Sequence, residues 1–282
     1  TGLMRTEKEM LGLILNIAKQ DKNIKAVCMN GSRVNVKIQP DIHQDFDIVY
    51  IVENLEDIIA DLEWINQFGN RIITQFPEAQ DLYPSELEER YPILMLFDDY
   101  NRIDLTLLSK NKLSEYLAED KLIKVLLDKD NLLPKNNSVS EASYWISKPY
   151  QKLFDECINE YYWVSTYVMK GIWRNELLYS IDHLNICRRM LLLMLAWDKG
   201  YKFDFQVNFG KSFKYLPNYL GSNKNSELTS TYPHLNTNEI KEALYKMTEM
   251  FEYAAVMVSK KCKLNYDTEN YAEVKKYIGF NN

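Results

Sequence analysis

The sequence predicts an α+β fold, in which a mixed sheet with flanking helices is followed by an all-helical C-terminal domain. In the first half, short apolar runs typical of strands alternate with segments of helical period. In the second half, three long segments of helical period dominate. A chain of 282 residues is long enough for two domains. We place the boundary in the polar stretch 133–143 and predict domains at 1–140 and 141–282.

The elements of the first half begin with a helix in which Thr6 and Glu9 have the spacing of a capping box. The apolar run 46–52 predicts a strand that is buried on both faces. Asp98 and Asp99 belong to a hairpin turn that joins two further strands. The predicted helices are 6–21 and 54–68, and the predicted strands are 24–29, 46–52, 91–97, 102–108 and, with its turn, 124–131.

The second half predicts three long helices separated by short breaks. Gly171 and Gly200 stand where glycine often ends a helix. The polar stretch 220–237 is predicted to be a loop. The predicted helices are 149–171, 173–200 and 237–262.

The composition limits the classes of partner. A net charge of −6 argues against a protein that grips a nucleic-acid backbone, which requires a basic face, so we expect no nucleic-acid partner. The charge is compatible with a cationic small-molecule ligand, since an acidic cleft concentrates cations. The four cysteines form no Cys-x-x-Cys pair and are expected to be reduced, buried thiols. We expect no signal peptide and no membrane span, because the longest apolar stretch is far short of the roughly 20 residues that a span needs. We expect a cytoplasmic monomer without membrane contact.

Two aspartates at the start of the predicted strand 46–52 are the first candidates for chemistry. Side chains alternate along a strand, so Asp45 and Asp47 share one side while Phe46 points into the core. Two carboxylates at this spacing can share Mg²⁺, which binds through one or two carboxylates together with substrate phosphates. Asp104, inside the apolar strand 102–108, is costly to bury unless it is paired or bound to metal, and is a natural third ligand. The sequence therefore predicts a magnesium site at Asp45, Asp47 and Asp104.

A glycine-serine pair precedes the two aspartates by one loop. Gly31 permits a tight turn and close approach to a phosphate, and Ser32 adds a hydroxyl and a backbone amide. Arg33 could neutralise phosphate charge or face solvent. The structural alternative is that Asp45 and Asp47 only begin a strand and that Asp104 is an edge charge of the hairpin.

Four segments together resemble a known family: "NGSR", "QDFDIVYIV", "NRIDLTLL" and "FGKSFKYL". They look like the aminoglycoside 6-adenylyltransferases, also called streptomycin adenylyltransferases, within the nucleotidyltransferase superfamily of polymerase-beta-like fold. The resemblance runs from about Arg5 to the C-terminus. The residues that match the family pattern are Gly31, Ser32, Asp45, Asp47 and Asp104.

The resemblance implies a reaction in which AMP moves from ATP to the 6-hydroxyl of streptomycin, with Mg²⁺ and with release of pyrophosphate. It implies that Asp45, Asp47 and Asp104 hold the metal and that Gly31 and Ser32 contact the triphosphate. It also implies a nucleotidyltransferase domain at the N-terminus and an acceptor-binding helical domain. We expect Asp104 to accept the proton of the acceptor hydroxyl.

Two groups in the helical half are candidates for substrate contact. Lys211 and Lys214 could reach the triphosphate from one helical turn, or could be ordinary solvated lysines. Glu176 and Asp182 could bind the guanidinium groups of streptomycin, and Trp173 could stack on one of them. The alternatives are a surface glutamate at a helix start and a packing tryptophan.

Two rival functions remain open from the sequence. The acceptor could be another aminoglycoside, a lincosamide or an RNA end, because pocket shape decides acceptor choice. The protein could instead be a catalytically idle, nucleotidyltransferase-like binding module, such as one half of a toxin–antitoxin pair.

Overall fold

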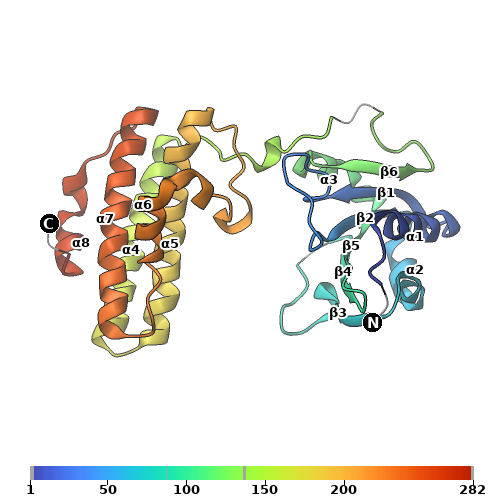
Figure 1. Ribbon diagram of the computed structural model, residues 1–282, viewed down its shortest axis with the longest axis horizontal. Helices are drawn as coiled ribbons and strands as arrows, with labels where there is room; N and C mark the ends of the chain where they lie inside the picture. The colour runs from blue at the N-terminus through green and yellow to red at the C-terminus, as the bar shows by residue number, and fades with distance from the viewer. Residues whose placement is uncertain (1–2, 87, 136–137, 281–282) are drawn as a thin grey trace. The chain divides into compact units, whose positions relative to one another are not determined.

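The computed structural model describes residues 3–86, 88–135 and 138–280 (Figure 1). The chain divides into two compact units, Thr1–Ser143 and Tyr144–Asn282. The N-terminal unit contains the sheet, and the C-terminal unit is helical in its described part. This arrangement confirms the predicted α+β fold class, with a mixed sheet first and helices after it.

A mixed sheet of six strands forms the centre of the described N-terminal unit (Figure 1). The strand order is β3-β4-β5-β2-β1-β6. β2 and β5 pair in parallel, while the other neighbouring pairs are antiparallel. The strands are β1 (Ile24–Asn30), β2 (Phe46–Val52), β3 (Arg71–Gln75), β4 (Arg90–Phe97), β5 (Arg102–Ser109) and β6 (Lys124–Asp128).

The two faces of this sheet have separate apolar cores. On one face, Phe46, Ile48 and Tyr50 pack with α1 and α2, and the Tyr50 hydroxyl donates to the Ile14 carbonyl at 2.6 Å. On the other face, Val49 and neighbours pack against α3. β2 is thus buried on both sides as predicted, except near its start. The helices of this unit are α1 (Glu7–Gln20), α2 (Leu55–Ala60) and α3 (Leu113–Glu119), and its 3₁₀ turns are Glu63–Phe68, Pro77–Ala79 and Lys110–Lys112.

The C-terminal unit is built around three long helices that contact one another, α4, α5 and α7 (Figure 1). A single apolar core runs between them, and Tyr161 stacks on Phe251 with ring centroids 4.1 Å apart. No helix among the described residues is long and apolar enough to cross a membrane. The helices are α4 (Gln151–Trp173), α5 (Leu177–Gly200), α6 (Pro217–Thr229), α7 (Thr237–Cys262) and α8 (Ala272–Tyr277), with 3₁₀ turns at Ala142–Tyr144, Tyr201–Phe203, Lys211–Phe213 and Thr268–Tyr271.

Three sequence expectations differ from the structure. The predicted helix 54–68 breaks at Asp61, whose carboxylate accepts the Glu63 amide at 2.9 Å and so competes with the helix ladder. Most of the predicted loop 220–237 belongs to α6, which turns sharply at Gly221. Gly171 lies inside α4, where it leaves room for Ser180 of α5, because a Cβ there would be 2.2 Å from the Ser180 hydroxyl.

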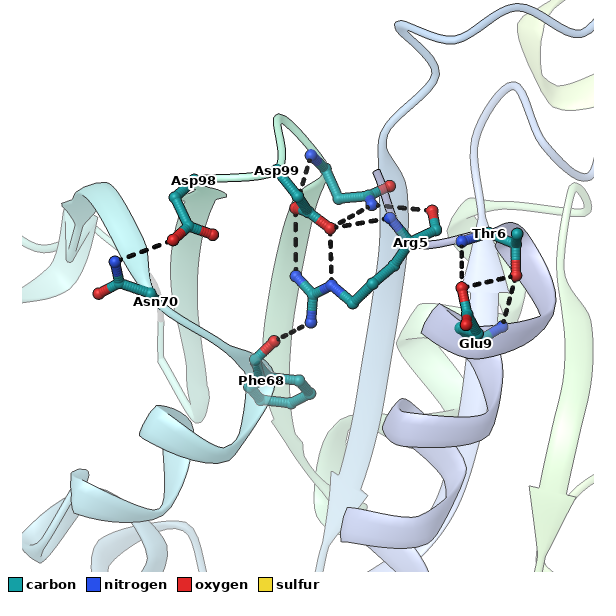
Figure 2. A network of polar contacts seen from close by, with 8 residues as sticks. Arg5, Thr6, Glu9, Phe68, Asn70, Asp98 and Asp99 are labelled. Carbon is teal, nitrogen blue, oxygen red and sulfur yellow. Dashed lines mark hydrogen bonds and ion pairs between the residues drawn. The ribbon is translucent and has the colours of Figure 1, made fainter. Parts of the chain in front are cut away.

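The start of the chain is anchored to the β4–β5 turn by an ion pair (Figure 2). The Arg5 Nε donates to Asp99 Oδ2 at 2.7 Å, and the Asp99 side chain is only 7% exposed. Asp99 also accepts the Asn101 amide, as expected for a turn aspartate. Burial raises the pKa of Asp99, but the hydrogen bonds from Arg5 and Asn101 outweigh it and hold the pKa well below its usual range.

Asp99→Asn is expected to lower the free energy of unfolding by about 2 kcal/mol at pH 7, because it removes the charge that Arg5 pairs with. A depressed carboxyl pKa stabilises the fold above the unfolded-state pKa, so the deficit should shrink below about pH 4. Urea unfolding at pH 7 and pH 3 measures both effects. Asp98→Asn is the control, since exposed Asp98 accepts only the Asn70 amide among described contacts (Figure 2). Equal losses from both variants would contradict the prediction.

Candidate active site

Three neighbouring strands place polar side chains in one row on the α3 side of the sheet. Asp47 of β2 is the register partner of Asp104 of β5 and of Asn30 of β1. Register partners project from the same face of a sheet, so these three side chains lie side by side. Together with Asp120 they line a cavity of about 260 Å³. The pairing of β2 with β5 thus brings Asp47 and Asp104 together, as their expected shared role requires.

Gly31 makes the close approach to Asp47 possible. It follows β1 directly with φ +77°, a backbone conformation that glycine adopts at little cost. A Cβ on this residue would lie 2.0 Å from Asp47 Oδ2, so no other residue type fits without displacing the carboxylate. The chain then continues in turns, with the Val34 amide donating to the Gly31 carbonyl at 3.1 Å.

Burial and neighbouring acidic charges raise the pKa values of Asp45 and Asp47. Burial, followed by the charges of Asp104 and Asp45, raises the pKa of Asp47 to about 6. Burial also raises the pKa of Asp45, against the attraction of Arg102. The site therefore holds its negative charge at a cost, and it favours any cation that reduces the repulsion.

Arg102 supplies one such cation from within the chain. Its guanidinium donates to both carboxylate oxygens of Asp104, at 2.7 and 2.8 Å, and its Nε lies 3.6 Å from Asp45 Oδ2. Arg102 is two residues before Asp104 on β5, so both side chains are on one face. The side chain is 44% exposed, which leaves it free to move when another cation arrives.

Arg102→Gln is expected to raise the pKa of Asp47 above about 6, because the positive charge of Arg102 now lowers it. The pKa can be measured by ¹³C NMR of the carboxyl carbon during a titration without metal. Arg90→Gln is the matched control, since Arg90 lines the same cavity but pairs with Glu119. An unchanged Asp47 pKa in the Arg102 variant would contradict the expectation.

The two residues after Gly31 have different surroundings. Ser32 is half-buried in the turn, and within the described ranges its hydroxyl makes no hydrogen bond. Arg33 donates to the backbone carbonyls of Asp45 and Gln44 at 3.1 and 2.8 Å, and its guanidinium lies 3.8 Å from the Phe46 ring centroid. Arg33 thus ties the Gly31 turn to the start of β2, so a contact with phosphate would compete with these bonds.

The donor set fits a divalent cation. Asp45, Asp47 and Asp104 offer only oxygen ligands, which Mg²⁺ prefers, and their mutual repulsion is relieved by a positive charge. In the part of the chain that is described, no group of three acidic, histidine or cysteine side chains is already gathered as a metal site. Arg102 is the counter-ion of Asp104 in this arrangement.

The candidates in the helical unit fall into two places. Asp182 of α5 lines a cavity of about 580 Å³ together with Ser212 and Phe213, which lie between Lys211 and Lys214. Both lysines are exposed; Lys211 begins a 3₁₀ turn and Lys214 directly follows it, in place of the expected helical turn. Ser212 adopts a left-handed conformation there, with φ +56°.

Trp173 and Glu176 lie at the turn between α4 and α5. Trp173 ends α4, is 55% exposed and meets the Tyr277 ring edge to face at 5.3 Å. Glu176 is the exposed residue directly before α5. This position agrees with the alternative prediction of a surface glutamate at a helix start. Neither residue lines the cavity that Asp182 enters.

Sequence reasoning missed several polar residues of the N-terminal site. Tyr116 donates through its hydroxyl to Asn30 Oδ1, and Asn30 Nδ2 donates to Asp120 Oδ2 at 3.0 Å. Tyr116 and Asp120 come from α3 and its C-terminal end, an element that the sequence pattern did not predict. Arg102 could have been found, because its spacing of two from Asp104 places it on the same face.

Comparisons with known proteins show which family the chain resembles. The family model described as streptomycin adenylyltransferase matches residues 4–280. An aminoglycoside 6-adenylyltransferase of Campylobacter jejuni is 40% identical over 271 residues, covering 96% of this chain and 93% of that protein. One of Bacillus subtilis (strain 168) is 40% identical over 265 residues, covering 93% of each.

A solved structure is also similar. The crystal structure of an aminoglycoside 6-adenyltransferase from Bacillus subtilis is 34% identical, with coverage of 98% of this chain and 100% of that chain and a TM-score of 0.47. From the family match and the identity over nearly the whole length, the chain belongs to the aminoglycoside 6-adenylyltransferases, a family of nucleotidyltransferase enzymes.

Proposed function

We propose that this enzyme transfers AMP from ATP to the 6-hydroxyl of streptomycin and releases pyrophosphate. The observation that carries the proposal is the row of Asp47 and Asp104 on paired strands, with Asp45 beside them and Gly31 packed against Asp47. Carboxylates clustered beside a glycine turn suit a nucleotide with its metal. The family descriptions support an aminoglycoside as the acceptor.

Asp45, Asp47 and Asp104 would hold Mg²⁺ in this proposal. When bound, Mg²⁺ would neutralise phosphate charge and help to stabilise the charge that develops during phosphoryl displacement. The pKa of Asp47 is raised by burial beside like charges, which a bound cation would offset. Arg102 would have to release Asp104 as the ion binds, because both compete for the same carboxylate oxygens.

The remaining roles concern binding and proton transfer. Gly31 and Ser32 would contact the triphosphate, Lys211 and Lys214 would add positive charge from the helical unit, and Arg33 would keep the turn in place. The 6-hydroxyl oxygen attacks the α-phosphorus while the bond to the β-phosphate oxygen breaks, and pyrophosphate leaves with that electron pair. Asp104 would accept the hydroxyl proton.

The acceptor would be recognised mainly by the helical unit. Its guanidinium groups match carboxylates, which makes Asp182 and Glu176 the candidate partners and Trp173 a stacking surface. Asp182 lines a cavity whose wall also carries Arg188 and Arg189, whereas Glu176 and Trp173 do not line it. We accordingly propose a nucleotidyltransferase domain at 1–140 and an acceptor-binding domain at 141–282.

The test is incubation of the protein with ATP, Mg²⁺ and streptomycin, followed by measurement of pyrophosphate. Release that depends on streptomycin supports the proposal, and NMR of the product identifies the modified hydroxyl. If pyrophosphate is released only with another aminoglycoside or with a lincosamide, that compound replaces streptomycin as the proposed acceptor. If folded protein binds nucleotide but releases no pyrophosphate with any acceptor, the proposed activity is wrong.

A further inference from the structure

Arg188 of α5 is a buried cation whose described partners are all uncharged. It is 4% exposed. Its Nε donates to the Thr231 hydroxyl at 2.9 Å, its Nη1 donates to Asn185 Oδ1 at 2.6 Å, and its Nη2 donates to the Thr231 carbonyl. Its guanidinium also lies 3.8 Å from the centroid of the Tyr232 ring. In the described chain, no acidic side chain forms an ion pair with Arg188, which leaves its charge without a full counter-charge.

A buried charge of this kind is costly unless it serves a ligand or a structural partner. The Thr231 carbonyl follows the C-terminal end of α6, where a cation is favourable, so part of the cost is met within the fold. These three hydrogen bonds use three of the five N–H groups of the guanidinium, which leaves donors for a further acceptor.

The guanidinium borders the cavity of about 580 Å³ that was described above. Five other lining residues decide its character: Asp182, Arg189, Ser212, Phe213 and Tyr232. Two arginines against one aspartate give this wall a positive excess, and exposed Lys211 and Lys214 flank the Ser212–Phe213 segment. Ser212 and Phe213 both have left-handed backbones, at φ +56° and +58°, a strain that proteins often retain at binding sites.

We propose that Arg188 and Arg189 form an anion subsite in the helical unit that binds the phosphates of the nucleotide or of the departing pyrophosphate. A planar, permanently charged guanidinium suits phosphate oxygens because it can donate two parallel hydrogen bonds. The identification of the anion rests on the proposed adenylyl transfer, whereas the anion subsite itself rests only on the cavity and its arginines.

A second cavity beside this one favours a nucleotide over free phosphate. Phe213 also lines a cavity of about 330 Å³, whose walls include the aromatic side chains of Trp145, Trp197 and Phe209. The Trp145 Nε1 is buried and has no hydrogen-bond partner among the described residues. An aromatic cavity with an unused donor, adjacent to an anion subsite, is suited to a purine ring next to its phosphates.

The experiment is calorimetric titration of the full-length protein with pyrophosphate, and separately with ATP, in EDTA. Without divalent ions the carboxylates of the N-terminal site repel these anions, so binding reports the helical unit. Arg188→Gln is expected to weaken pyrophosphate binding about 10-fold or more. Arg188→Lys keeps the charge but loses the paired geometry, and should weaken binding less. If the Gln variant does not fold, the Lys variant still decides the question.

Asp182→Asn is expected to change the affinity for pyrophosphate in the opposite direction. It removes a negative charge from the same cavity and is expected to tighten pyrophosphate binding roughly threefold. A purely structural Arg188 predicts no such gain. Lys260→Gln is the control, because it removes an exposed positive charge in the last turn of α7 that lines neither cavity, and it should leave pyrophosphate binding in EDTA unchanged.

Pyrophosphate affinity that is the same in Arg188→Gln, Arg188→Lys and the unmodified protein would overturn the anion subsite. Equal affinity for ATP and pyrophosphate would overturn the assignment to the whole nucleotide and favour the product. Failure of the proposed reaction would be seen separately, as absence of pyrophosphate release in the presence of Mg²⁺ and acceptor.

Discussion

Gly31→Ala is expected to reduce adenylyl transfer about 100-fold or more, because the added methyl group would displace Asp47. The Cβ would lie 2.0 Å from Asp47 Oδ2 and 2.9 Å from its carboxyl carbon. The carboxylate must therefore move away from Asp104, its neighbour on β5. The backbone at φ +77° adds a cost of about 1 kcal/mol for any residue with a Cβ. Steady-state pyrophosphate release measures the loss of activity.

Two other glycines separate the clash from the backbone strain. Gly221 has φ +79° but open space where a Cβ would be, so Gly221→Ala tests the strain alone. Gly12 lies in α1 with open space and an ordinary φ, and Gly12→Ala should leave the fold as stable or slightly more stable. Both variants should keep their activity. Equal losses of activity in Gly221→Ala and Gly31→Ala would show that the contact with Asp47 is not the cause.

Asp47→Asn is expected to lower turnover by roughly 100- to 1000-fold while making the protein more stable. The loss follows from removing a carboxylate that the proposed mechanism assigns to the metal. The gain follows because the pKa of Asp47 is raised to about 6, so folding works against its charge at neutral pH. The gain in unfolding free energy without metal should be roughly 1–3 kcal/mol at pH 7.

The pH dependence of this variant provides its own control. A raised carboxyl pKa means that the native protein takes up the proton first, so lowering the pH through about 6 relieves the penalty in the unmodified protein. The stability difference between the two proteins should therefore shrink from pH 7 to pH 5, as measured by urea unfolding in EDTA. A variant that is inactive and also less stable at pH 7 would contradict this electrostatic explanation.

The placement of Asp47 on β2 was predictable because the period of a strand is local. The alternation of the strand sends Phe46 into one core and Asp47 to the opposite face, while Asp45 directly precedes β2. The alignment of Asp47 with Asp104 was not predictable from spacing, because it depends on the pairing of strands that are distant in sequence. The contacts of Arg33 were equally hidden, since sequence cannot show which carbonyls a side chain will reach.

The elements that sequence reasoning missed are those with weak periodic signals. β3 is an edge strand in which Ile72 and Ile73 are both more than half exposed, so it lacks the alternation that marks a strand. α6 is largely polar, and Gly221 interrupts it with a positive φ that is not helical. Its sequence therefore resembles that of a loop. The long helices were predictable because each buries a continuous apolar stripe.

The parallel pairing of β2 and β5 has a consequence for engineering. The register of two paired strands does not depend on the length of the loops between them, so Asp47 and Asp104 can stay aligned while the loops that join α2, β3 and β4 are shortened or extended. A single residue inserted into β5 before Asp104 would instead turn this carboxylate to the opposite face. Libraries that seek new acceptors can therefore vary loop length freely, while within these two strands they should vary only residue identity.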